Sequence, residues 1–168
     1  MIAQILGILG FILSIISFQQ NTQKRIVLMQ FLANISFCIH FYLIGAYTGS
    51  ILNGIGILRS FVYYFKDKKW ASSNLWIVFF SLVFVVAGIF TWQGMISVLP
   101  TVAMILTSIS FGIKNPKLVR RISFPSSPLW LIYNVINRSL GGVLTECFSM
   151  ISILVGMYRF DRQKKKTQ

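Results

Sequence analysis

The sequence predicts an all-α membrane protein with seven transmembrane helices. Hydrophobic residues make up 55% of the 168 residues and charged residues only 11%, with a mean hydropathy of +0.73. A soluble domain needs roughly a quarter of its residues charged to cover its surface with polar groups. Apolar segments of about 17–20 residues, enough to cross a hydrocarbon layer about 30 Å thick, follow one another along the chain. We therefore expect the lipid bilayer to surround the protein and no extramembrane domain to be present.

Polar breaks divide the apolar sequence into seven segments. The predicted spans are 2–18, 27–46, 49–65, 73–91, 95–113, 122–140 and 143–160. Lysines and arginines follow the first, third, fifth and seventh spans, whereas the loops around Thr48 and Gly94 have none. Of the 16 basic residues, all but Arg59 and Arg138 fall on one side, which the positive-inside rule makes cytoplasmic. This pattern predicts the N-terminus outside and the C-terminus in the cytoplasm. It also explains the net charge of +13 without a nucleic-acid partner.

The first three spans repeat in the sequence as the last three. At an offset of 93 residues, ILSIISF (12–18) lies over ILTSISF (105–111), and the loops and neighbouring spans align with them. Because the two units begin four spans apart, both enter the membrane in the same direction, as in transporters built from parallel repeats. We therefore expect a 3+1+3 arrangement. Its predicted parts are a first three-helix bundle (1–66), a linker transmembrane helix (67–93), a second three-helix bundle (94–161) and a basic cytoplasmic tail (162–168).

Three stretches resemble the YgjV family of bacterial inner-membrane proteins: HFYLIGAYTGSILNGI (40–55), VLPTVAMILTSISF (98–111) and LWLIYNVINRSLGGVLTE (129–146). In layout this family resembles the SWEET, PQ-loop and PnuC-type transporters. The resemblance implies an inner (plasma) membrane location and a SWEET-like fold, but it names no substrate. SWEET-type halves carry prolines in both repeats, whereas all four prolines of this chain lie in the second half. SWEET-type sites also have an asparagine on the third helix of each half, which Asn53 matches and Glu146 replaces.

Ionisable and polar residues inside a membrane are candidates for function because burying them in hydrocarbon costs several kcal/mol. The candidate substrate-binding residues are Asn53, Glu146, His40, Tyr133, Asn134, Arg59 and Trp130. The offset of 93 pairs Asn53 with Glu146 and His40 with Tyr133, so these groups are expected to converge between the halves. Each has a structural alternative. Glu146 could form an ion pair with Arg138 or Arg59, and Arg59 could be a structural counter-ion or reach toward the cytoplasmic side. His40 could be a packing residue and Asn53 an interhelical hydrogen bond. Trp130 could face lipid instead of forming a stacking wall.

The remaining chemistry-bearing residues predict no reaction centre. Asp67 and Asp161 lie among cytoplasmic lysines and arginines, where solvated ion pairs are expected, and Cys38 and Cys147 are read as packing residues. The chain has no phosphate-binding glycine loop, no zinc-ligand spacing and no catalytic triad. We expect no enzyme activity, no cofactor and no metal.

The expected function is a membrane transporter, either a facilitator or proton-linked, that moves a small polar solute such as a sugar or nucleoside. Alternating access between the two halves would carry the solute across. A non-transporting receptor, immunity factor or accessory protein is the alternative, and a homo-oligomer is possible in either case.

Overall fold

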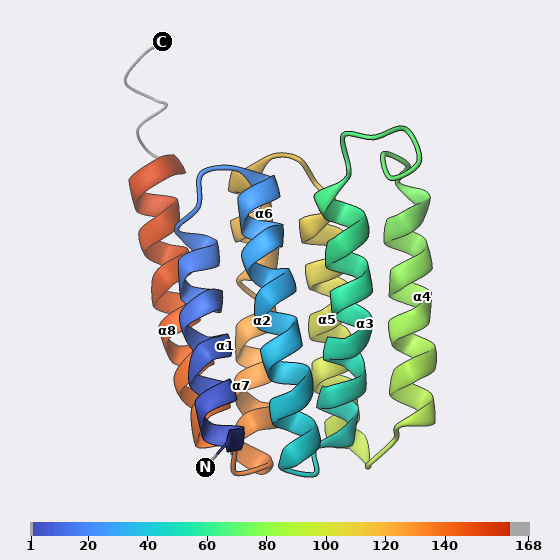
Figure 1. Ribbon diagram of the computed structural model, residues 1–168, viewed down its shortest axis with the longest axis vertical. Helices are drawn as coiled ribbons and strands as arrows, with labels where there is room; N and C mark the ends of the chain where they lie inside the picture. Colours follow the sequence, from blue (N-terminus) through green and yellow to red (C-terminus); the bar gives the residue numbers. More distant parts are fainter. Residues whose placement is uncertain (1, 162–168) are drawn as a thin grey trace.

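The chain folds into a bundle of helices that stand side by side (Figure 1). The computed structural model describes residues 2–161, and within that range it contains no β-strand. The helices are α1 (Ile2–Phe18), α2 (Gln23–Leu43), α3 (Tyr47–Tyr64), α4 (Leu75–Phe90), η1 (Met95–Ser97), α5 (Val98–Phe111), α6 (Pro116–Ser123), α7 (Ser126–Ile136), α8 (Leu140–Gly156) and η2 (Met157–Asp161).

The predicted all-helical class is confirmed, but one predicted span is not a continuous helix. Segment 122–140 was expected to be one helix, but α6 ends at Ser123 and a separate helix, α7, covers Ser126–Ile136. The two helices lie one above the other (Figure 1). The basic segment from Pro116, predicted as a loop, is already helical. Pro125 is the N-cap of α7 and Pro128 lies in its first turn. Proline has no backbone N–H and is tolerated only in the first turn of a helix, so these two residues start a new helix instead of continuing α6.

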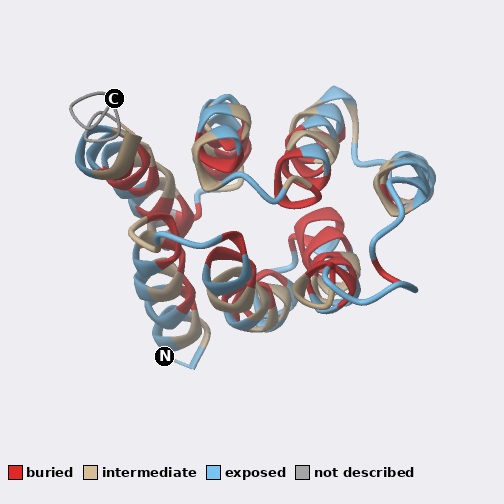
Figure 2. Cartoon of the chain, turned by 90° about the horizontal axis from the view of Figure 1, so that it is seen from above, coloured by how far each residue is buried: buried red, intermediate tan, exposed pale blue. Residues whose placement is uncertain are grey.

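Six helical columns form a ring, and α4 lies outside it. Around the ring, each column packs against the next in the order α1, α2, α3, α5, α7, α8 and back to α1. The short helix α6 extends the α7 column, and α4 packs mainly against α3 and α5. Seen from above in Figure 2, the buried faces of the ring helices point inward, and α4 stands apart at one edge. The interior of the ring is therefore where polar side chains can be sheltered from the surroundings.

Helix ends recur at the offset of 93 residues found in the sequence. Helix α1 ends at Phe18 and α5 at Phe111. Thr22 and Asn115 are the N-caps of α2 and α6, and the side chain of each accepts a hydrogen bond from the backbone N–H at the start of its helix. A side-chain oxygen at this position satisfies one of the free N–H groups of the first turn. The same local signals thus begin and end equivalent helices in both halves.

Turns and hydrogen bonds recur at the same offset. Gly45 (φ 77°) and Arg138 (φ 54°) both adopt the left-handed conformation in the turn that precedes the third helix of each half. Ser17 Oγ donates to Ile26 O over 3.1 Å, and Ser110 Oγ donates to Val119 O over 3.2 Å. Arginine in a left-handed conformation is strained where glycine is not. Arg138 therefore has the backbone conformation of its counterpart Gly45, although it is not a glycine.

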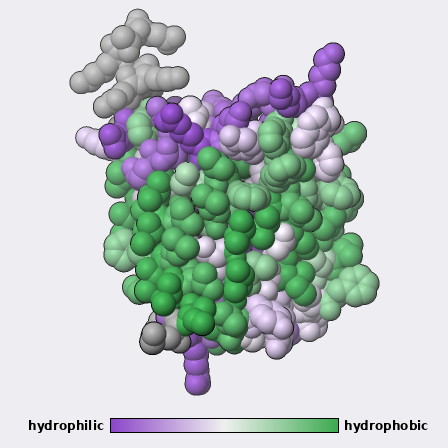
Figure 3. Space-filling view, viewed as in Figure 1, coloured by the Kyte–Doolittle hydropathy of each residue, from purple (hydrophilic) through white to green (hydrophobic). Residues whose placement is uncertain are grey.

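The face of the bundle shown in Figure 3 is largely apolar between its two ends. Figure 3 shows a broad hydrophobic band over this face, with hydrophilic residues along the upper edge. Large apolar side chains such as Leu75, Leu82 and Phe90 on α4 are exposed. Two helical stretches, Gln23–Leu43 and Gly141–Asp161, are long and apolar enough to cross a membrane, while Ile2–Phe18, Leu75–Phe90 and Met95–Phe111 are apolar but shorter. The fold is thus compatible with a membrane protein.

The upper end of the bundle contains two ion pairs of different character. Lys114 Nζ lies 2.9 Å from Asp67 Oδ1, and the two side chains are 62% and 70% exposed, which is the solvated pair predicted for Asp67. A hydrogen bond from Lys114 and its positive charge lower the pKa of the Asp67 carboxyl. Asp161 differs from its prediction because it pairs with Arg120 at 9% and 1% exposure. This pair is buried because η2 covers α6. The predicted basic tail, 162–168, lies outside the described residues.

Candidate functional site

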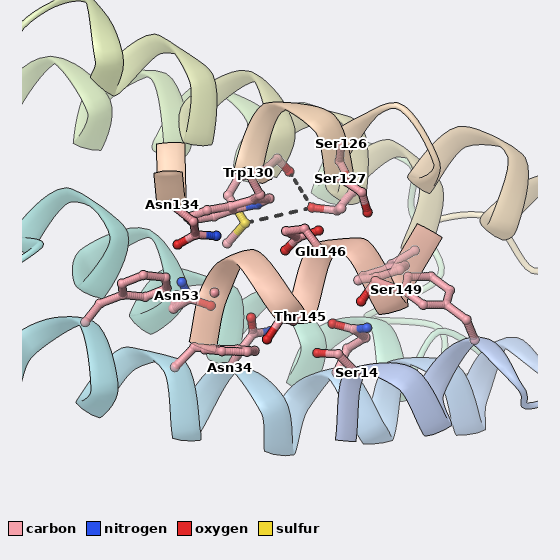
Figure 4. A pocket seen from close by; sticks show the side chains of 18 of the residues that line it. Ser14, Asn34, Asn53, Ser126, Ser127, Trp130, Asn134, Thr145, Glu146 and Ser149 are labelled. Atoms are coloured by element: carbon pink, nitrogen blue, oxygen red, sulfur yellow. Dashed lines mark hydrogen bonds between the residues drawn. The ribbon is translucent and has the colours of Figure 1, made fainter. Parts of the chain in front are cut away.

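The ring of helices surrounds a cavity with a mixed polar and aromatic lining. Its volume is about 80 Å³, whereas a single water molecule needs about 10–15 Å³ measured in the same way. Every column of the ring contributes side chains, and α4 contributes none among the described residues. Figure 4 shows the polar groups of α1, α2, α3, α7 and α8 gathered around this space. The cavity can therefore hold several water molecules or a small polar solute.

The two halves contribute equivalent positions to the lining. Six pairs of lining residues are related by the offset of 93: Ser14 and Thr107, Phe18 and Phe111, Asn34 and Ser127, Phe37 and Trp130, Phe41 and Asn134, Asn53 and Glu146. Within each pair, one member comes from α1, α2 or α3 and the other from α5, α7 or α8. The cavity thus lies where corresponding helix faces of the two halves meet.

Glu146 on α8 is the acidic residue of the cavity. Its side chain is only half-buried, although it lies inside the ring, because part of its surface borders the cavity. Ser127, at the start of α7, lies beside it in Figure 4. Within residues 2–161, Glu146 forms no ion pair with Arg59 or Arg138. The structural ion pair that was left open as an alternative is therefore not formed in this structure.

Arg59 on α3 is the basic residue of the cavity lining and is 1% exposed. Its Nη1 donates to Met104 O (3.1 Å), Thr107 Oγ1 (2.7 Å) and Ser108 Oγ (3.3 Å), all on α5. Its guanidinium carbon lies 5.3 Å from the centroid of the Phe84 ring and 5.2 Å from that of Phe111. The aromatic faces and the hydrogen bonds together hold a positive charge at the cavity wall.

Two asparagines face each other across the halves with different hydrogen bonding. Asn53 Nδ2 donates to Gly49 O over 2.8 Å, one turn earlier on α3. Asn134 on α7 is packed against the backbone of Gly142 on α8. Its Oδ1 is buried and accepts no hydrogen bond from the described residues. A buried acceptor without a donor costs about 1–3 kcal/mol, so this oxygen is a position where a ligand N–H or O–H group would stabilise the protein.

Aromatic rings form one wall of the cavity. Trp130 stacks on Phe41 with ring centroids 5.8 Å apart and an interplanar angle of 17°. Both residues and Phe37 belong to the cavity lining. Trp130 is 7% exposed, so it faces the interior of the protein and not lipid, and its role as a stacking wall for a solute stays a prediction.

Comparison with known proteins assigns the family. The family Imp-YgjV, described as "Bacterial inner membrane protein", matches residues 1–164. This chain belongs to that family. The inner membrane protein YgjV of Escherichia coli (strain K12) is 22% identical over 169 residues, covering 98% of this chain and 87% of the relative. No solved structure matches. The resemblance predicted from the sequence is confirmed, and with it the location in a bacterial inner membrane.

Two of the predicted site residues of this YgjV-family protein do not line the cavity. His40 is buried, with Nδ1 2.8 Å from Ala3 O and Nε2 3.4 Å from Ser139 Oγ. Tyr133 is also buried, and its hydroxyl accepts a hydrogen bond from Gly49 N over 3.2 Å. Both residues are enclosed at the end of the bundle that contains the 44–46 and 137–139 turns. The other five predicted residues, Asn53, Glu146, Asn134, Arg59 and Trp130, are brought together around one cavity.

Several polar lining residues of this YgjV-family site were missed in the sequence. They are short hydroxyl and amide side chains: Ser14, Gln30, Asn34, Thr107, Ser126, Ser127, Thr145 and Ser149. Serine and threonine are common in membrane helices as packing and hydrogen-bonding residues, so their presence alone indicates no site. The signal available was the offset of 93, which pairs Ser14 with Thr107 and Asn34 with Ser127. Among residues 2–161, no three His, Cys, Asp or Glu side chains are placed to hold a metal ion.

Proposed function

We propose that this protein is a multi-pass transporter that moves a small polar solute across the inner membrane by alternating access between two three-helix halves. The observation that carries this proposal is the polar cavity between the halves, lined by equivalent residues of each. Parallel repeats related by an axis along the membrane normal are a known transporter architecture, with the substrate site at the repeat interface. The first half is α1–α3, the second is α5–α8, and α4 connects them in a SWEET-like 3+1+3 layout.

The apolar band and the distribution of charge support seven crossings. Helix α4 contributes nothing to the cavity and exposes large apolar residues along its length, as expected of a helix surrounded by lipid. Basic residues gather at one end of the bundle, on the 19–25, 65–74 and 112–121 segments. By the positive-inside rule this end faces the cytoplasm and the N-terminus lies outside.

Hydrogen bonds join the two halves at both ends of the bundle. At the cytoplasmic end, Gln23 Nε2 donates to Phe111 O (2.8 Å) and Gln19 Nε2 to Ser152 O (2.7 Å). At the outer end, the contacts of His40 with Ser139 and of Gly49 with Tyr133 join the halves. Interhelical hydrogen bonds in membranes contribute only about 0.6 kcal/mol on average. Either set can therefore open while the other stays closed, and in this scheme His40 and Tyr133 hold the outer end together.

Glu146 gives the cavity a group that can exchange a proton during the cycle. We include a proton-linked mode in the proposal because this carboxyl borders the cavity and has no basic partner among residues 2–161. The site has hydrogen-bonding groups but no arrangement of nucleophile, base and oriented partner. We therefore propose transport and no enzyme activity. The non-transporting alternative would be favoured by a closed core in which Glu146, Arg59 and His40 pair with one another, and the structure has a cavity instead.

Solute flux in proteoliposomes tests the function. The wild-type protein is expected to mediate uptake of at least one class among sugars, nucleosides and amino acids, above the leak of protein-free vesicles. With proton coupling, wild-type uptake varies between pH 5 and pH 8, and Glu146→Gln removes that dependence. Equal flux of both proteins across this pH range would indicate a facilitator that is not coupled to protons. Flux at the level of empty vesicles for every class would contradict transport.

A further inference from the structure

The guanidinium of Arg59 has one free edge. All of its hydrogen bonds to described residues come from Nη1, and Nε is buried without a partner among those residues. Nε and Nη2 form the side of a guanidinium that binds a carboxylate with two parallel hydrogen bonds. The edge used on α5 is therefore not the edge that recognises a planar anion, and that second edge has no hydrogen-bonding partner among residues 2–161.

The opposite half offers acceptors without a positive charge nearby. Glu146 has the carboxylate, and Asn134 has a buried Oδ1 that accepts no hydrogen bond from residues 2–161. Both belong to the α7–α8 pair, whereas Arg59 belongs to α3. The stacked rings of Trp130 and Phe41 lie in the same cavity, and aromatic faces attract cations. This part of the cavity thus fits an ammonium group as the Arg59 edge fits a carboxylate.

From this arrangement we infer that the cavity binds a small zwitterion, whose carboxylate lies on the Nε–Nη2 edge of Arg59 and whose ammonium group lies between Glu146, Asn134 Oδ1 and the Trp130–Phe41 wall. This inference rests on the proposed function, since it names the class of solute that the transporter takes. A ligand carrying both charges would neutralise both halves of the cavity at once. A sugar or nucleoside would leave the buried guanidinium of Arg59 without a counter-charge, which is costly for a buried ion.

The size and spacing of the site restrict the zwitterion. A cavity of about 80 Å³ holds about five to eight water-sized units, which is comparable to a small amino acid. Arg59 lies six residues beyond Asn53 on α3, or about 9 Å along the helix, and Asn53 is the counterpart of Glu146. Equal depth of Asn53 and Glu146 in the two halves would separate the two charged sites along the bundle and leave room for ligands whose charges lie several bonds apart.

Binding to the purified full-length protein, measured by isothermal titration calorimetry and by thermal shift, tests the inference. The zwitterionic probes are alanine, γ-aminobutyrate and glycine betaine. Propionate carries only the anion, propylamine only the cation, and ribose neither. At least one zwitterion is expected to bind about tenfold or more tightly than both singly charged probes, because each loses one desolvated charge contact. Ribose or propionate binding as tightly as every zwitterion would overturn the inference.

Two variants separate the roles of the charges. Glu146→Gln is expected to weaken zwitterion binding about tenfold or more and to leave propionate binding unchanged or stronger. Arg59→Gln is expected to weaken zwitterion binding equally and to spare propylamine. The exposed Asp67→Asn is the control and should change neither. Should Arg59→Gln fail to fold, Glu146→Gln alone decides, because an equal loss for zwitterion and propionate would contradict a cation-specific role.

Flux measurements keep this inference apart from the proposed function. Zwitterion binding without zwitterion flux would support the site and contradict transport. Flux of ribose or a nucleoside, with no zwitterion bound or carried, would support transport and overturn the zwitterion site. Carriage of a bound zwitterion, blocked by both Glu146→Gln and Arg59→Gln, is the expected result.

Discussion

Gly142 and Asn134 are packed so closely that the cavity wall depends on the absence of a side chain at position 142. A Cβ atom built on Gly142 would collide with the amide group of Asn134. Its neighbour Gly141 is also in α8, but a Cβ there would meet only Gln4 Oε1 at 3.9 Å, an ordinary contact. The two adjacent glycines therefore differ in function: one makes room for a cavity residue, and the other does not.

This difference predicts opposite effects for two similar substitutions. Alanine is favoured over glycine in a helix by about 1 kcal/mol, so Gly141→Ala should leave the melting temperature unchanged or raise it. Gly142→Ala must displace Asn134, and overpacking costs typically about 1–3 kcal/mol. We expect a lower melting temperature for Gly142→Ala, with weakened ligand binding, measured by thermal unfolding in detergent and by calorimetry. Equal melting temperatures and equal binding for the two variants would show that Asn134 can move without consequence.

The residues of the site were only partly predictable for a physical reason. Charged residues such as Glu146 and Arg59 stand out in an apolar sequence because their burial is costly. Serines such as Ser14 and Ser127 do not, because a hydroxyl group can satisfy itself on its own helix. His40 and Tyr133 do not line the cavity, because a polar residue in a membrane helix can face either a cavity or a neighbouring helix. The hydrophobic pattern of the sequence places such a residue on a helix but does not show what its side chain faces.

At the scale of helices, the break between α6 and α7 gives the second half a feature that the first half lacks. Helix α2 runs without interruption from Gln23 to Leu43, whereas the equivalent segment is split at Phe124 and Pro125. The break was missed because a proline in the first turn of one helix and a proline that bends a continuous helix look alike in sequence. Ser126 and Ser127 follow the break directly and line the cavity, so the new helix start contributes two serines to the cavity lining.

The position of α6 is fixed by the Arg120–Asp161 pair, which predicts a large effect of a single charge. Arg120 also donates from Nη1 to Gln20 O over 3.1 Å, so it connects α6, η2 and the end of α1. Removing one partner of a buried ion pair leaves the other charge uncompensated and costs roughly 3 kcal/mol. Asp161→Asn is therefore expected to lower the melting temperature clearly at neutral pH. A melting temperature equal to that of the wild type would show that the Arg120 guanidinium becomes hydrated when its partner is lost.

The exposed pair Asp67–Lys114 is the matched control for that experiment. Asp67→Asn should change the melting temperature little, because exposed ion pairs contribute little to stability. Since Lys114 lowers the pKa of the Asp67 carboxyl, the small contribution is present above the ordinary carboxyl pKa and is lost as the pH falls through the lowered value. The wild type and Asp67→Asn should therefore converge in melting temperature on acidification.

For the whole molecule, the predicted all-helical class is confirmed, and the 3+1+3 arrangement stays a prediction. The offset of 93 residues anticipated which helices have matching ends, caps and cavity faces, because equivalent sequences form equivalent local contacts. It did not reveal the closed ring of α1, α2, α3, α5, α7 and α8, since packing between halves depends on side-chain shapes that the offset does not encode. The direction of the bundle in the membrane follows from charge alone, so it remains a prediction that a labelling experiment can test.

Two cysteine variants determine the orientation, in a background with Cys38 and Cys147 replaced by alanine. Lys68 lies exposed in the loop between α3 and α4 at the basic end, and Gln93 lies exposed in the loop between α4 and η1 at the opposite end. Because the cytoplasmic side carries the basic loops, Gln93→Cys should react with a membrane-impermeant maleimide added to intact spheroplasts, and Lys68→Cys should react only in inside-out vesicles. The predicted odd number of membrane crossings, the side on which the N-terminus lies and the side from which the cavity opens all depend on this result. Labelling of Lys68→Cys in intact spheroplasts would show that the bundle has the opposite orientation. Labelling of both variants from one side would contradict the crossing of the membrane by α4, and with it the 3+1+3 layout.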